Sequence, residues 1–127
     1  MTRYTHEDLI PRLQAIIAAK PEGYVYEQRI LPGETSEGCY YQWEGAPDCI
    51  VGHLLHGLGV SIAEFEMMDR FGKVIGDLHG HLSGLGLEFT PSAWDLMILV
   101  QVDQDNGISW ARSLEYAIES IERNVKP

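Results

Sequence analysis

The sequence predicts an α+β fold that is mostly helical, with about four to five helices and one antiparallel β-hairpin. Capped segments with apolar residues at helical spacing recur along the chain, and two short aromatic and β-branched stretches lie close together near its first third. The 127 residues contain no repeat, linker or low-complexity tract. We therefore expect one globular domain over residues 1–127, which is long enough to bury a core without disulfides or metals.

The expected helices each follow a Ser, Thr or Asp that can cap free backbone amides. In two of them an acidic residue stands at the third helical position, as in a capping box. The segment from Pro91 is apolar nearly all round, which is typical of a central helix. A short, broken helix is expected in the glycine-rich stretch 72–86. The five main helices run from Thr5 to Lys20, from Cys49 to Gly59 with Asp48 as N-cap, from Ile62 to about Arg70, from Pro91 to about Asp105, and onward from Ser109.

The expected hairpin pairs Tyr24–Ile30 with Cys39–Trp43 across an exposed loop, Leu31–Gly38. Aromatic residues are concentrated on these two strands, and exposed tyrosine and tryptophan are typical of protein-contact surfaces. Cross-strand packing of the same rings is the alternative. The candidate partner-binding residues are Tyr24, Tyr26, Tyr40, Tyr41 and Trp43.

The net charge of the chain and the composition of its segments limit the classes of function that the sequence supports. The net charge is −10, and the nine basic residues form no cluster, so we expect no direct binding of nucleic acid. No export signal and no apolar run of about 18 residues is present, which predicts a cytoplasmic protein without a membrane span. The acidic surface suits solubility, a basic protein partner or mimicry of a nucleic acid.

Cysteine and histidine residues supply one candidate metal site. Cys49, His53 and His56 have spacings that place them on one face of a helix. The predicted ligands are Cys39, Cys49, His53 and His79, with His56 or His81 as substitutes for His79. Zinc would be the metal, but the chain lacks the paired spacings of known zinc sites. In the alternative, both cysteines are buried as small apolar residues and no cofactor is bound.

Other chemical interpretations are weaker. Cys49 is a candidate nucleophile because a helix start favours a thiolate, but the adjacent Asp48 opposes thiolate formation. Asp103 and Asp105 resemble only a fragment of a calcium loop. Residues 91–123 also have the pattern of a DNA-binding helix-turn-helix. Its recognition helix would place three glutamates in a groove lined by DNA phosphates, which would repel them.

Several segments resemble a group of small proteins encoded by actinobacteriophages and some actinobacteria. That group has a Cys-Leu-Val-Gly-His motif near the middle and Gln-x-x-Gln-Asp-x-Gly-x-x-Trp near the end. The matching segments here are Cys39-Tyr40-Tyr41, Pro47–Leu55 with Ile50 in place of the leucine, Leu58-Gly59-Val60 and Gln101–Trp110. The resemblance implies a phage-type origin rather than an activity.

These observations predict a non-enzymatic accessory protein that acts by protein–protein interaction, on a protein of the bacterial host. The acidic surface, the aromatic hairpin and the incomplete catalytic sets favour this function. A metal-binding protein using the Cys/His cluster is the first alternative. A small-ligand binder with a pocket between hairpin and helices is the second.

Overall fold

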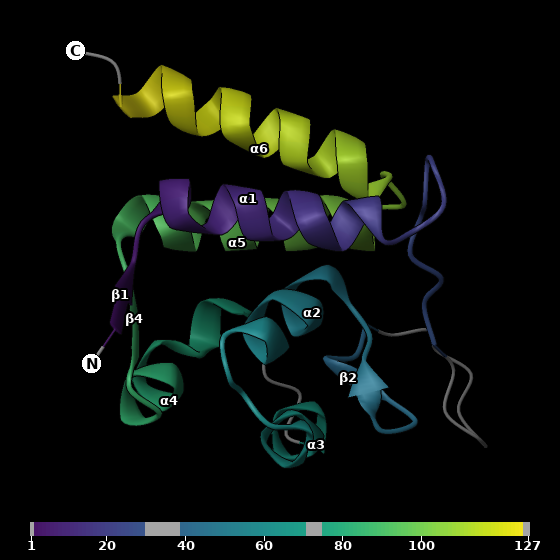
Figure 1. The fold of residues 1–127 in the computed structure, drawn as a ribbon, viewed down its shortest axis with the longest axis vertical. Helices are drawn as coiled ribbons and strands as arrows, with labels where there is room; N and C mark the ends of the chain where they lie inside the picture. The colour runs from purple at the N-terminus through teal and green to yellow at the C-terminus, as the bar shows by residue number, and fades with distance from the viewer. Residues whose placement is uncertain (1, 30–38, 71–74, 126–127) are drawn as a thin grey trace.

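The computed structural model describes residues 2–29, 39–70 and 75–125 (Figure 1). The helices are α1 (His6–Ala18), α2 (Ile50–Gly57), α3 (Ile62–Arg70), the 3₁₀ helix η1 (Ile75–Asp77), α4 (His79–Gly84), α5 (Pro91–Asp105) and α6 (Trp110–Val125). The strands are β1 (Thr2–Tyr4), β2 (Gln42–Trp43), β3 (Ala46–Pro47) and β4 (Leu87–Phe89). The prediction of a mostly helical α+β domain is confirmed.

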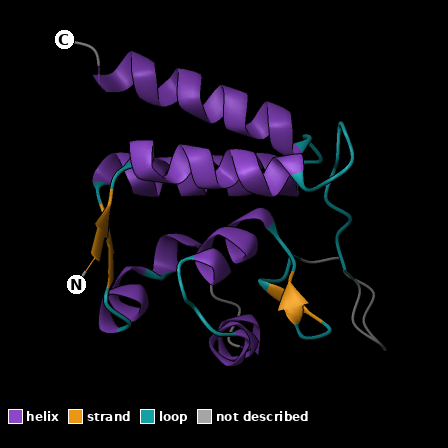
Figure 2. Ribbon diagram, viewed as in Figure 1, coloured by secondary structure: helices purple, strands orange, loops and turns teal. Residues whose placement is uncertain are grey.

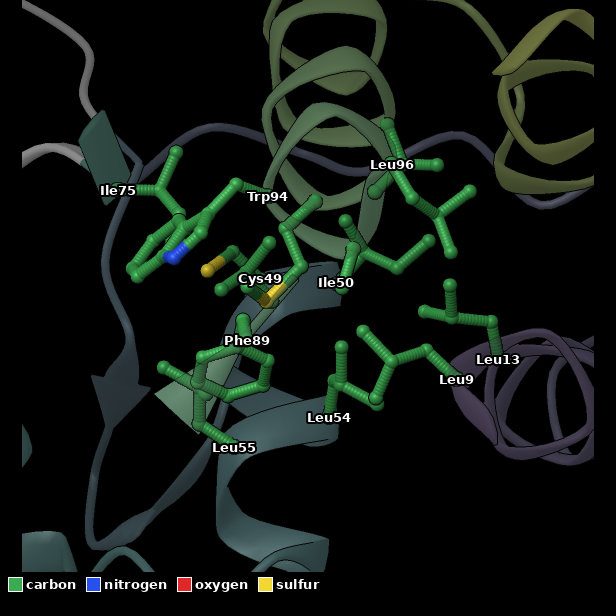
Figure 3. Close-up of a cluster of buried hydrophobic side chains, with 14 of the residues drawn as sticks. Leu9, Leu13, Cys49, Ile50, Leu54, Leu55, Ile75, Phe89, Trp94 and Leu96 are labelled. Atoms are coloured by element: carbon green, nitrogen blue, oxygen red, sulfur yellow. The ribbon is translucent and has the colours of Figure 1, made fainter. Parts of the chain in front are cut away.

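Helix α5 lies at the centre of the molecule. It packs against α6, α1 and α2, and the three long helices α1, α5 and α6 run alongside one another (Figure 1). The shorter helices α2, α3 and α4 lie on the other side of α1 and α5. Leu9 and Leu13 of α1, Leu54 of α2 and Leu96 of α5 meet in the core between them (Figure 3). The apolar faces of these helices therefore pack together in one continuous core.

The local start signals of α1 and α5 act as expected. Thr5 and Asp8 form a complete capping box at α1, and the Thr90 side chain accepts a hydrogen bond from the Ala93 amide at the start of α5. The expected broken helix is present as η1 and α4, while 72–74 lie outside the described residues. No described helix combines the length and the apolar composition needed to cross a membrane.

The predicted strand pairing is wrong. Residues 24–28 form no strand, and β2 pairs with β3 in a two-residue hairpin (Figure 2). The turn residues Glu44 and Gly45 both have positive φ angles, 54° and 81°, which is the conformation that such tight hairpins require. The expected connecting loop 31–38, together with Ile30, lies outside the described residues.

The segment around Tyr24 forms a backbone hydrogen bond with a part of the chain that is distant in sequence. The Tyr24 carbonyl accepts the Trp110 amide at 3.0 Å, so part of its hydrogen bonding is with the start of α6. A second strand pairing, between β1 and β4, was not predicted from the sequence. The two strands are parallel, with Thr2 opposite Leu87 and Tyr4 opposite Phe89. This pairing joins the first residues of the chain to the segment that enters α5.

Candidate functional site

Two glutamines of α5 bind the free amides at the start of α2. Gln104 Oε1 accepts a hydrogen bond from the Ile50 amide at 2.8 Å and another from Trp110 Nε1 at 3.1 Å. Gln101 Oε1 accepts from the Val51 amide at 3.4 Å. Both glutamines are buried, and the first amides of a helix have no partner within the helix. The side chains of α5 therefore supply the polar contacts that allow α2 to begin inside the core.

Both cysteines belong to the same network. Cys49 is the N-cap of α2 and is fully buried, and its Sγ accepts from the Gly52 amide at 3.2 Å (Figure 3). Cys39 Sγ accepts from the Nε2 atoms of Gln101 at 2.7 Å and Gln104 at 3.4 Å. The neighbouring Cys49 thiol, followed by burial, raises the pKa of Cys39. A raised pKa keeps the Cys39 thiol protonated at neutral pH.

Asp48 does not cap α2, which corrects the predicted helix start by one residue. Its buried carboxylate is held instead by Arg29, with Nη2 at 2.7 Å from Oδ1 and Nε at 3.2 Å from Oδ2. The Tyr26 hydroxyl donates to the same Oδ2. Hydrogen bonding to Asp48 raises the pKa of Arg29, and burial followed by the same carboxylate raises that of Tyr26. A two-point guanidinium–carboxylate pair of this kind fixes the orientation of both groups.

The five candidate aromatic residues divide into two groups. Tyr26 and Tyr41 are 4% and 5% exposed, so their rings belong to the core rather than to a contact surface. Tyr24 is half-buried and packs edge-on against Trp110, with 4.7 Å between ring centroids. The sequence analysis had named all five as candidate partner-binding residues, and the burial of Tyr26 and Tyr41 removes these two from an exposed surface.

Tyr40, Trp43 and Arg29 form a cluster at the surface that we call the aromatic platform. The Tyr40 and Trp43 rings are 5.3 Å apart between centroids, and the Arg29 guanidinium lies over the Trp43 ring at 5.5 Å. All three residues are partly exposed. Asp48 is buried and pairs with Arg29, so the platform is attached to a buried carboxylate next to the start of α2.

The predicted metal ligands come together only in part. The structure brings Cys39 close to Cys49, but it places the His53 ring edge-on to Trp110, with 5.6 Å between centroids. His79 packs on Trp94 at 3.7 Å. In the segments that the structure describes, no three His, Cys, Asp or Glu side chains converge in a geometry that could hold a metal ion.

The other two histidines considered as ligands have contacts of their own. His56 Nδ1 lies 3.1 Å from the Val60 carbonyl, and His81 Nε2 lies 2.8 Å from a Glu64 carboxylate oxygen. The second of these contacts joins α4 to α3, so His81 links two short helices.

His79 lines an open cavity of about 370 Å³ between α4, β1, β4 and α5. Phe89 and Trp94 contribute to its wall, and Arg3, Ser83 and Glu88 provide polar groups around it. This cavity does not lie beside the β2–β3 hairpin, where the sequence had placed the pocket of a small-ligand binder.

The sequence analysis missed the two interactions that organise the site. The Gln101 and Gln104 side chains cap a helix that lies about fifty positions earlier in the chain, and Arg29 pairs with Asp48. One usable signal was present, since two glutamines three positions apart on an otherwise apolar helix need polar partners in a core.

No protein-family model, curated protein or solved structure matches this chain.

Proposed function

We propose that this chain is a non-enzymatic, phage-type accessory protein that binds a protein partner through the aromatic platform. The observation that carries the proposal is the arrangement of Tyr40, Trp43 and Arg29, which are partly exposed and in contact with one another, with Arg29 fixed by the buried Asp48. Tryptophan, tyrosine and arginine are the residues that most often dominate the binding energy of protein interfaces.

Contacts within the protein itself hold Trp43 and Arg29 of the platform in place. Trp43 lies in a tight hairpin, opposite Ala46, and the Asp48 carboxylate fixes the Arg29 fork at two points. Side chains that are already ordered lose little conformational entropy when they bind, so more of the contact energy appears as affinity. The cysteines and glutamines behind the platform have structural partners, which is consistent with a binding role rather than a catalytic one.

Charge suggests the kind of partner. The chain has a net charge of −10, and the positive charge of Arg29 is already balanced by Asp48. A partner with basic residues around an apolar contact would associate faster and bind more selectively. Together with the phage-type resemblance, this favours a protein of the bacterial host, met in its cytoplasm.

Affinity capture from bacterial lysates, with the whole protein as bait, tests the proposal. Trp43→Ala removes the largest ring of the platform, and we expect it to weaken partner binding about 30-fold, as a central interface residue does. Tyr116→Ala is the matched control, because Tyr116 is a 47% exposed ring on α6, outside the platform. Circular dichroism should show both variants folded.

The outcome distinguishes specific binding at the platform from non-specific binding of the bait protein. A partner retained by the wild type and by Tyr116→Ala, and lost by Trp43→Ala, supports the proposal. A partner that binds the Trp43→Ala variant equally well, or the lack of any specific partner across several hosts and growth states, contradicts it.

A further inference from the structure

The two cysteines are arranged as a pair rather than as separate residues. The Cys49 amide donates to the Tyr40 carbonyl at 3.0 Å, which brings the backbone next to Cys39 against the start of α2. Gln104 contacts both sides of this junction, with Nε2 at 3.4 Å from Cys39 Sγ and Oε1 at 2.8 Å from the Ile50 amide. The Cys49 thiol also raises the pKa of Cys39, which agrees with this proximity.

We propose that Cys39 and Cys49 are a disulfide-forming pair, a modification site that the binding function does not require. A bond between them would close a short loop that contains Tyr40, Trp43 and the β2–β3 hairpin. A disulfide requires only that the two Cα atoms lie within about 7 Å with the side chains directed at each other. Gln104 contacts Cys39, and the Tyr40 carbonyl accepts the Cys49 amide, so the two cysteines are brought near each other at the start of α2.

A low-molecular-weight disulfide such as oxidised glutathione is the oxidant class that fits the site. The Cys39 thiol loses its proton to solvent, and its sulfur attacks one glutathione sulfur, releasing the other glutathione, which takes up a proton. The Cys49 thiol then loses its proton and attacks the Cys39 sulfur, which breaks the mixed disulfide and releases the second glutathione. Two protein thiols are oxidised, and one glutathione disulfide is reduced to two thiols.

Burial assigns the order of these two steps. Cys49 is 0% exposed, whereas Cys39 is partly exposed, so an external disulfide meets Cys39 first. Because the pKa of Cys39 is raised, little of it is thiolate at neutral pH, and the first step is slow. We expect the exchange to accelerate as the pH rises toward alkaline values.

The experiment compares the native and the unfolded chain in the same glutathione redox buffers. After equilibration the sample is quenched with acid and denatured, free thiols are alkylated, and intact mass gives the oxidised fraction. A fold that holds the thiols for bonding should raise the equilibrium constant of the disulfide at least about tenfold over its value in urea, because disulfide and fold stabilise each other reciprocally. An equal or smaller constant in the native state would show that the fold holds the sulfurs apart, and would overturn the proposal.

Single-cysteine variants test the order of attack. Cys49→Ser keeps an N-cap side chain on α2, and it should accumulate a mixed disulfide of Cys39 with glutathione. Cys39→Ser leaves only the buried thiol, and it should stay unmodified while folded. Disulfide-linked dimers in place of the intramolecular bond in the wild type would also contradict the proposal.

Discussion

The start of α2 and the aromatic platform are adjacent, but they use their side chains in opposite ways. At the start of α2, buried amides, thiols and carboxamides are paired with one another across elements that are distant in sequence. On the platform, two rings and a guanidinium are left partly exposed, and Arg29 pairs with the buried Asp48. The comparison teaches that residue types often associated with catalysis can serve the fold, while the neighbouring surface stays available for the proposed binding.

The energetics of the two regions also differ. A buried donor that loses its acceptor costs about 1–3 kcal/mol, because water cannot replace the lost bond. A partly exposed ring on the platform can be removed at less expense to the fold, since solvent already covers part of it. Substitutions at the α2 start should therefore reduce stability, and substitutions on the platform should mainly affect binding.

The largest effect is expected for Gly52→Ala. A Cβ atom at this position would overlap the Tyr41 carbonyl oxygen and lie 3.1 Å from the Tyr41 carbonyl carbon. That oxygen also accepts the Asp48 amide at 2.9 Å, so the backbone cannot move without breaking this bond. We expect a loss of about 4 kcal/mol in the free energy of unfolding, measured by urea denaturation.

Gly57→Ala is the matched control, because it lies in the same helix and its added Cβ would meet no atom within 4 Å. It should be neutral or stabilise the protein by up to about 1 kcal/mol. Equal effects of the two substitutions would mean that the close approach of α2 to Tyr41 is not a constraint on the fold.

A smaller loss is expected for Gln104→Leu. This change makes the side chain apolar at a similar size, and it leaves the Ile50 amide and Trp110 Nε1 without their acceptor. We expect the free energy of unfolding to fall by about 2–3 kcal/mol in a urea titration. Gln42→Leu removes a side-chain acceptor from the Gly45 amide at the surface hairpin, and it should cost less than about 1 kcal/mol. A reversed order of the two losses would contradict the proposed contrast between the buried network and the surface hairpin that carries Trp43.

The smallest effect concerns pH and His53. Burial lowers the pKa of this imidazole from its ordinary value of 6.5. Between the lowered pKa and 6.5 the unfolded chain binds more protons than the folded one, so stability falls as the pH drops through this window. His53→Phe keeps a ring beside Trp110 but removes the titration.

The variant should therefore lose less stability than the wild type between about pH 7.5 and about pH 5.5, by under about 1 kcal/mol. Burial raises the pKa of Asp69 and Asp105, which acts in the opposite direction, but both carboxyls are present in each protein and cancel in the difference. Parallel pH profiles of the two proteins, obtained from urea midpoints, would contradict the assignment to His53.

The helices could be predicted because their signals are local. The capping box of Thr5 and Asp8 and the Thr90-Pro91 start each act within one turn of chain. The pairing of the Tyr24 segment could not be predicted in this way, because its β-branched and aromatic composition says nothing about which backbone groups will bond to it. Its carbonyl instead contacts the start of α6, a choice made by tertiary packing.

The candidate site was predicted in part for a related reason. The sequence analysis identified Cys39, Cys49 and Trp43 as residues of interest, but it could not show that Gln101 and Gln104 reach the cysteines and the start of α2. Contacts between residues so distant in the chain depend on how α5 packs against α2. A spacing rule within one helix does not contain that information.

The parallel pairing of β1 with β4 has a consequence for biosynthesis. Thr2–Tyr4 cannot pair until Leu87–Phe89 has left the ribosome, so β1 is secured long after it is made. Nascent α1 meets α2 first, but its contacts are complete only after α5 has followed, because Leu9 and Leu13 lie in the core between α1, α2 and α5. A chain that extends through α5, rather than a shorter fragment, is thus the unit that reaches the native state.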